Sequence, residues 1–236
     1  LSAASSQTVT VNFATVNGTA TAPGDYRTTS GSLTFAPGQT SKSFTVPVVG
    51  DSLDEAVETF LVNLSSAVNA AILDGQGQGT INDNDIAPPL TINNITVTEG
   101  TGSPVNAVFT VKLNVASGQS VSVHYDTANG SAVAPDDYSA NSGTVTFAPG
   151  ETSKTISVPV LGDALDEGTE MFLVNLSNAN NATIQVSQGK GTITDNDATP
   201  TLSINDVTVT EGTGATVDAA FTVTLSAASG QPVSVK

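Results

Sequence analysis

Hydrophobic and polar residues alternate with a period of two along most of the chain. In SVSVHYD (120–126), valine and tyrosine alternate with serine, histidine and aspartate, and the segments TISVPV (155–160) and MFLVNLS (171–177) continue the pattern. Successive side chains of a strand point to opposite faces, so these segments predict strands with one buried face. Pro159 lies inside one of them, and we expect that strand to lie at a sheet edge or to carry a bulge. No segment shows a convincing helical period.

The chain is an internal repeat. The segment TSKSFTVPVVGDSLDEAVETFLVNLS (40–65) aligns without gaps with TSKTISVPVLGDALDEGTEMFLVNLS (152–177), an offset of 112 residues. The same offset carries GTINDND (79–85) onto GTITDND (191–197) and PLTINNITVTEGTG (89–102) onto TLSINDVTVTEGTG (201–214). We therefore divide the chain into a repeat that lacks its first strands (1–86), a complete repeat (87–198) and the first strands of a third repeat (199–236), here called repeats 1, 2 and 3.

Glycine, proline, asparagine and aspartate interrupt the pattern about every ten residues. About seven short strands in a repeat of this length predict an all-β fold of tandem, immunoglobulin-like antiparallel β-sandwiches. The links around IAPP and ATP contain proline. We expect them to hold neighbouring sandwiches in a fairly fixed relation.

Charge narrows the possible functions. The chain has 22 Asp and Glu residues against 6 Lys and Arg, and its net charge is −16. This charge argues against nucleic acids and anionic membranes as partners, since both attract basic surfaces, and no apolar run is long enough for direct membrane insertion. With one histidine, no cysteine and no tryptophan, the chain lacks the usual nucleophile–base pairs and the aromatic platforms of sugar-cleaving enzymes. We expect that it is not an enzyme.

Acidic residues recur at the predicted strand ends, and loops distant in sequence meet at one end of a Greek-key sandwich. Several carboxylates gathered there repel one another unless a cation joins them, and Ca²⁺ prefers six to eight oxygen ligands. In repeat 2 the candidates are Glu99, Asp137, Asp163, Asp166, Glu167, Asp195 and Asp197, with Glu170 left open. In repeat 1 they are Asp25, Asp51, Asp54, Glu55, Asp83 and Asp85.

The motifs VTEGTG, DY, GDALDEGTEMFLVNLS and TITDND, in this order across the whole repeat, resemble the Calx-β domain family. The resemblance implies a calcium-binding β-sandwich. Carried over by position, it also implies the ligands Glu99, Asp137, Asp163, Glu167, Asp195 and Asp197. The chain departs from the exchanger members at Gly162-Asp163, where they have paired aspartates, and at Asp195-Asn196-Asp197, where they have three successive acids. Fewer charges imply fewer ions or weaker binding.

We expect a calcium-stiffened structural segment of a bacterial-type extracellular adhesin, surface fibre or matrix protein. Two alternatives stay open: a calcium-sensing regulatory module, or an adhesion module of cadherin-like or carbohydrate-binding type. The segment NDNDIAP resembles cadherin inter-domain linkers, but the other cadherin motifs have no counterpart. A surface or glycan ligand cannot be identified from the sequence.

The expected partners are neighbouring repeats and copies of the chain itself. Repeat 3 supplies opening strands and repeat 1 lacks them, so the tail of one chain could complete the head of another by strand donation. Glu211 would then supply the ligand that repeat 1 lacks, and open head-to-tail joining would produce a filament. The rival interpretation is that the chain is one segment of a longer polypeptide.

Overall fold

The computed structural model describes residues 1–236 and confirms the all-β prediction, since every regular element is a strand. Contacts divide the chain into two compact units. Unit 1 contains residues 1–87 together with 116–119, and unit 2 contains residues 88–115 and 120–236. No helix is present that is long and apolar enough to cross a membrane.

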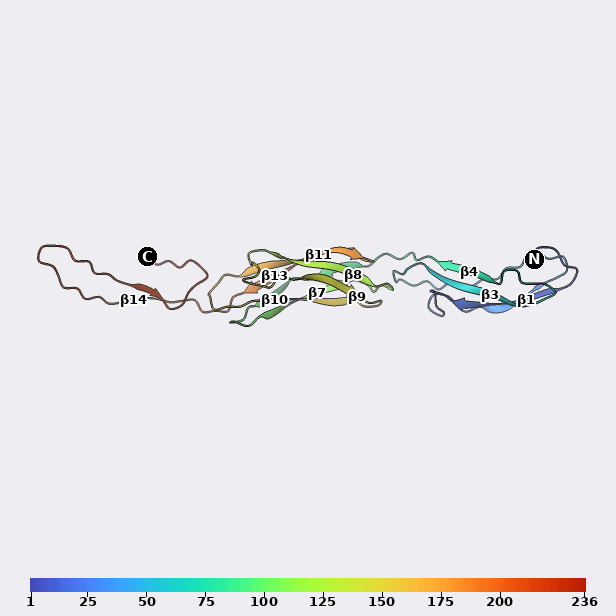
Figure 1. The fold of residues 1–236 in the computed structure, drawn as a ribbon, viewed down its shortest axis with the longest axis horizontal. Coiled ribbons are helices and arrows are strands. Elements are labelled where there is room, and N and C mark those ends of the chain that lie inside the picture. Colours follow the sequence, from blue (N-terminus) through green and yellow to red (C-terminus); the bar gives the residue numbers. More distant parts are fainter. The chain divides into compact units, whose positions relative to one another are not determined.

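Unit 2 contains a two-sheet sandwich, whose strands run along a common direction in Figure 1. One sheet has the order β10-β7-β5-β12 and the other has the order β6-β13-β11-β8-β9. Their bounds are β5 (Pro89–Ile92), β6 (Ile95–Thr98), β7 (Val105–Leu113), β8 (Val121–Asn129), β9 (Ser142–Phe147), β10 (Ser153–Val160), β11 (Glu170–Asn180), β12 (Thr183–Ile184) and β13 (Gln188–Thr194).

The core of the sandwich comes from the alternating residues. In β11, Phe172, Val174 and Leu176 are buried, as the sequence predicts, and so are the alternate residues of β7, β8 and β10. The ring of Phe172 stacks on Tyr138 at a centroid distance of 4.6 Å and meets Phe109 edge-on at 5.8 Å. Burying a side chain of this size stabilises the fold by about 1.5–3 kcal/mol.

Two details refine the predicted topology. Pro159 lies in β10, an edge strand that pairs with β7 without a register shift, so the edge position explains the proline. The pairing is antiparallel except for two short parallel pairs, β12 with β5 and β13 with β6. The first strand of the repeat breaks after β5 at Asn93 and continues as β6 in the opposite sheet, where it lies parallel to the last strand.

Unit 1 contains a single sheet of order β2-β1-β3-β4. These strands, β1 (Val9–Asn17), β2 (Ser30–Phe35), β3 (Glu58–Val68) and β4 (Gln76–Ile81), correspond at the 112-residue offset to β8, β9, β11 and β13. The opposite sheet is missing from unit 1. Residues 41–48, which correspond to β10, form no strand. Their single β-bridge joins Val48 to Tyr26, and Phe44 stacks on Phe13 at a centroid distance of 4.0 Å.

Repeat 3 forms one small antiparallel pair within unit 2, β14 (Leu202–Ile204) with β15 (Val223–Leu225). Leu202 pairs with Leu225 in the register in which Leu90 pairs with Leu113 in repeat 2. The opening strands of repeat 3 therefore already have the pairing of a complete repeat, while their apolar residues remain largely exposed.

Candidate metal centre

The parallel pairing of β6 and β13 brings the first acidic residues of unit 2 together. Thr98 and Thr194 are paired at the ends of these strands, and the Glu99 backbone N–H donates to the Thr194 carbonyl at 3.1 Å. Glu99, Asp195 and Asp197 each place a carboxylate oxygen within 4.8 Å of the others. The strand order predicted from the sequence already placed these three acidic residues at one end of the sandwich. The parallel pairing of β6 with β13 is the physical cause of their proximity.

The turn between β10 and β11 adds Asp163 and Glu167 to this end of the sandwich. Burial raises the pKa of Glu167, and the negative charges of Asp163, Asp137, Asp195 and Asp197 raise it further. The Asp163 Oδ1 accepts a hydrogen bond from the Leu165 backbone N–H at 2.7 Å, which fixes the turn. All six residues implied by the family resemblance therefore lie in one acidic group.

Two observations show that this group lacks a positive partner. Glu99 is only 7% exposed. Burial raises its pKa to about 7, assisted by a hydrogen bond to Asp195 and by the charges of Asp195, Glu167 and Asp163. The Asp197 Oδ2 is buried and has no hydrogen-bond partner. The chain's one salt bridge, between Glu151 and Lys154, involves neither residue.

The chemistry of these donors fits a hard divalent cation. They are carboxylate oxygens without histidine or cysteine, the set that Ca²⁺ prefers over transition metals. A buried carboxylate oxygen without a donor is costly unless it is paired or coordinates a metal. The residues present therefore fit the Ca²⁺ expected from the sequence.

Gly162 explains one departure from the exchanger pattern. Its backbone packs against the backbone of Gly100, so that a Cβ atom at residue 162 would overlap the Gly100 carbonyl. A second aspartate cannot occupy this position while Gly100 lies there. The close approach of the two glycines holds Glu99 beside the turn that carries Asp163.

Glu170, which the sequence left open, belongs to the same region. Burial raises its pKa to about 7, together with the charge of Asp137 and a hydrogen bond to it, and the charge of Glu167 adds to the effect. Its equivalent in unit 1, Glu58, was not among the predicted ligands. The signal was present, because each glutamate opens a strand three residues after the glutamate of its DE turn.

Unit 1 contains a corresponding acidic group. Asp25, Glu55 and Glu58 have carboxylate oxygens within 4.8 Å of one another. Burial raises the pKa of Glu55, followed by the charges of Asp51, Asp25, Asp83 and Asp85. Unit 1 thus gathers five of its six predicted residues together with Glu58, but it contains no equivalent of Glu99.

Asp54 and Asp166 have hydrogen-bond partners of their own. The Asp54 Oδ2 accepts from Ser117 Oγ at 3.3 Å and from Gln119 Nε2 at 3.2 Å, within unit 1. The Asp166 Oδ1 accepts from Thr199 Oγ1 at 3.2 Å, although its charge still contributes to the raised pKa of Asp197. Glu211 is exposed in repeat 3 and belongs to neither acidic group.

The Calx-beta domain model matches residues 1–85 and 82–199. Sodium/calcium exchanger 1 of Mus musculus is 30% identical over 191 residues, which cover 72% of this chain and 20% of the exchanger. Adhesion G-protein coupled receptor V1 of Danio rerio is 27% identical over 208 residues, or 81% of this chain and 3% of the receptor. The chain thus corresponds to a small part of these relatives.

Among solved structures, the apo-form Calx CBD1 domain is 24% identical and covers 46% of this chain and 97% of its own, with a TM-score of 0.40. CBD12 from CALX1.2 is 20% identical and covers 80% of this chain and 88% of its own, with a TM-score of 0.39. These scores are too low to add to the assignment, which rests on the family model. Since that model matches most of the sequence, in two tandem copies, the chain belongs to the Calx-beta domain family.

Proposed function

We propose that this chain is a calcium-binding structural segment of an extracellular or cell-surface protein, stiffened by Ca²⁺ at the ends of its sandwiches. The observation that carries the proposal is the buried Asp197 Oδ2, which has no hydrogen-bond partner and lies in the group formed with Glu99 and Asp195. Membership of the Calx-beta family supports the same ion.

The residues that would hold the ion in unit 2 are Glu99, Asp137, Asp163, Glu167, Asp195 and Asp197, with Glu170 adjacent. When bound, Ca²⁺ supplies the positive charge that these carboxylates lack. They come from four separate segments of the chain. Joining them therefore fixes the ends of β6 and β13 to the turn between β10 and β11. A ligand present at 100 times its dissociation constant stabilises the folded state by about 2.7 kcal/mol.

Calcium titration calorimetry on the 236-residue chain tests the binding. We expect heat from Ca²⁺ that Mg²⁺ does not reproduce, because Mg²⁺ gives up its bound water reluctantly. The variant Asp197→Asn should remove the binding assigned to unit 2. The matched variant Asp206→Asn alters an exposed aspartate of repeat 3 and should leave that binding unchanged. Equal titrations of the parent and Asp197→Asn would reject the assigned site.

The similarity to sodium/calcium exchangers favours a second candidate, a calcium-sensing regulatory module. The dissociation constant separates the two functions. Sensors typically bind at about 10⁻⁷–10⁻⁵ M, whereas extracellular modules bind at about 10⁻⁴–10⁻³ M. Because Gly162 and Asn196 leave the site with fewer carboxylates than the exchanger pattern, we expect the weaker range. Micromolar binding would favour the sensor.

A further inference from the structure

The loop between β8 and β9 carries Asp137, one of the ligands proposed for calcium in unit 2. It leaves the sheet at the end of β8 and returns to the sandwich at Tyr138. The equivalent loop of unit 1, between β1 and β2, carries Asp25 and returns at Tyr26. Contacts that occur in both loops therefore indicate how the chain holds this acidic residue.

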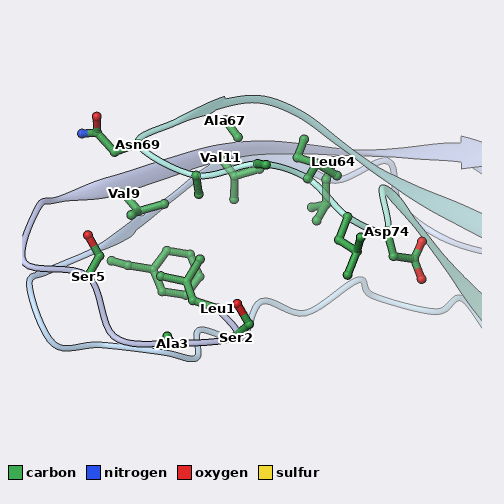
Figure 2. Close-up of a pocket in the computed structure, with 15 residues that line it drawn as sticks. Leu1, Ser2, Ala3, Ser5, Val9, Val11, Leu64, Ala67, Asn69 and Asp74 are labelled. Atoms are coloured by element: carbon green, nitrogen blue, oxygen red, sulfur yellow. The ribbon is translucent and has the colours of Figure 1, made fainter.

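An asparagine precedes each loop on the core-facing side of its strand. Asn129 pairs with the fully buried Phe172, and residues opposite each other in antiparallel strands point to the same face. Asn17 ends β1 in the same way, in the alternating register that begins with Val9 and Val11. Figure 2 shows these two valines pointing into an apolar pocket on that face. Each asparagine is therefore placed to direct its amide toward buried groups.

The Asn129 side-chain oxygen joins two points of the loop. Its Oδ1 accepts a hydrogen bond from the Tyr138 hydroxyl at 2.6 Å and another from the Ala134 backbone N–H at 3.0 Å. The equivalent Asn17 Oδ1 accepts the same two bonds in unit 1, at 2.6 Å from the tyrosine hydroxyl and at 3.1 Å from the backbone. We call this pair of bonds the asparagine clasp. It fixes the middle and the end of each loop.

Tyr138 connects the clasp to the core. The residue is 1% exposed, and its ring stacks on Phe172 at a centroid distance of 4.6 Å. A buried tyrosine hydroxyl needs a hydrogen-bond partner, and Asn129 provides it. Because the ring is held on both sides, the backbone of the preceding residue, Asp137, has little freedom to move.

The clasp also acts on the Asp137 carboxylate through the neighbouring backbone. The Asp137 Oδ2 accepts a hydrogen bond from the Val133 backbone N–H at 2.6 Å. In unit 1 the Asp25 Oδ2 accepts the equivalent bond from the Thr21 N–H, also at 2.6 Å. Val133 directly precedes Ala134, which the clasp holds. The clasp therefore fixes the donor that orients the carboxylate.

A second pair of bonds ties the loop to β11, the strand that opens with Glu170. The Ser131 Oγ accepts from the Met171 backbone N–H at 3.0 Å, and the Ala132 N–H donates to the Met171 carbonyl at 2.9 Å. These bonds bring Asp137 beside Glu170, and the hydrogen bond between the two side chains helps to raise the pKa of Glu170. The loop thus delivers its carboxylate to the acidic group.

We propose that Asn129 is a positioning residue of the calcium site and that Asn17 has the same role in unit 1. This inference rests on the calcium function proposed above. Asn129 does not contact the ion through its oxygen, which Tyr138 and Ala134 already occupy. It holds the loop so that Asp137 is oriented before the ion arrives, and binding then requires less ordering of the chain.

Calcium titration calorimetry on the 236-residue chain tests the role of Asn129. Asn129→Ala removes both bonds of the clasp and should weaken the binding assigned to unit 2 by about 10-fold or more, as is typical of residues that orient metal ligands. Asn129→Asp keeps an oxygen that can accept both bonds at an exposed position, and it should bind at least as tightly as the parent. Tyr138→Phe keeps the stack on Phe172, loses one bond and should show a smaller loss.

Asn141 provides the matched control. Its Oδ1 also accepts from a tyrosine hydroxyl, that of Tyr125 at 3.4 Å. Tyr125 precedes Asn129 by four residues along β8, or roughly 13 Å at the rise of a strand. Asn141→Ala should lower the melting temperature in chelator, as Asn129→Ala does, but keep the calcium affinity of the parent. Calcium should therefore raise the melting temperature less in Asn129→Ala than in Asn141→Ala.

The failure of this proposal can be distinguished from that of the calcium function. Equal affinity in the parent and Asn129→Ala, equal losses in Asn129→Ala and Asn141→Ala, or a loss that Asn129→Asp does not restore would each overturn the positioning role and leave the calcium site standing. A parent chain without calcium-specific heat would contradict the calcium function itself, and the role of Asn129 with it.

Discussion

Glu99 is the residue at which burial and charge conflict most directly. It is nearly inaccessible to water, and its pKa is raised to about 7 by burial, Asp195 and the acidic turn. The folded chain therefore stores repulsion at this end of the sandwich unless the residue is protonated or paired with a cation. The repulsion and the calcium affinity have the same origin.

We predict opposite effects of Glu99→Gln with and without calcium. In chelator at pH 8, removing the buried charge should raise the free energy of unfolding of unit 2, on the order of 2 kcal/mol. In calcium the variant should gain less stability than the parent, because a ligand is lost. Urea unfolding under both conditions measures the effects, and a variant that is destabilised in chelator would contradict the account.

Stability without calcium should depend on pH in the direction set by the raised pKa values. Glu99 and Glu170 have pKa values of about 7 in the folded chain and near 4.5 in the unfolded chain. The folded state binds more protons in this window, so stability is highest below pH 4.5 with respect to these groups and falls as pH rises to 7.

Calcium competes with those protons, so the rise in melting temperature that it produces should grow between pH 5 and pH 8. Thermal unfolding at pH 5, 6, 7 and 8, with chelator and with calcium, measures both trends. Melting temperatures in chelator that rise steadily with pH would show that the carboxylates are not in conflict in the folded state.

At the scale of elements, equivalent positions in different repeats provide matched controls. Phe109 is fully buried in β7, whereas Phe221 is 57% exposed. Phe109→Ala should cost about 3–5 kcal/mol of unfolding free energy because it leaves a cavity. Phe221→Ala should change the stability of the chain by less than about 0.5 kcal/mol. Urea unfolding at low protein concentration compares them, and equal costs would mean that Phe221 is already packed.

The loop at 229–231 lies against the acidic turn of unit 2. The Gly230 backbone N–H donates to the Asp166 carbonyl at 3.1 Å, and a Cβ atom at Gly230 would meet Glu167 Cγ at 2.7 Å. Gly230→Val should displace the Glu167 side chain and weaken calcium binding several-fold.

The matched control for this loop is Gly168→Val, since a Cβ atom there meets nothing within 4 Å. Calcium titration calorimetry compares the two variants. An unchanged affinity in Gly230→Val would show that Glu167 contributes no essential ligand atom.

Periodicity and the internal repeat were enough to predict strands at 120–126, 155–160 and 171–177, an edge strand or a bulge at Pro159, and the meeting of the acidic segments. The break between β5 and β6 could not be predicted, because the same strand residues can pair with either sheet and only packing decides. For a similar reason, the sequence left Glu170 open as a ligand and did not identify Glu58 as one. Whether the first residue of a strand faces the acidic end depends on the local twist.

For the whole molecule, the two units differ in completeness. Unit 2 contains both layers of a sandwich and the full acidic group, whereas unit 1 contains one layer and lacks an equivalent of Glu99. The 236-residue chain should therefore owe most of its calcium-dependent stability to unit 2. Over the whole chain the net charge is −16, and few carboxylates have a cationic neighbour. A bound cation would therefore relieve charge repulsion in the chain.

Thermal unfolding of the 236-residue chain in chelator, in millimolar Ca²⁺ and in millimolar Mg²⁺ tests the central claim most directly. A stabilisation of about 2–3 kcal/mol should raise the melting temperature by several degrees in Ca²⁺ and by much less in Mg²⁺. This result would identify the missing positive charge as a bound calcium ion. The same melting temperature in all three solutions would mean that the acidic ends bind no calcium, and it would contradict the account.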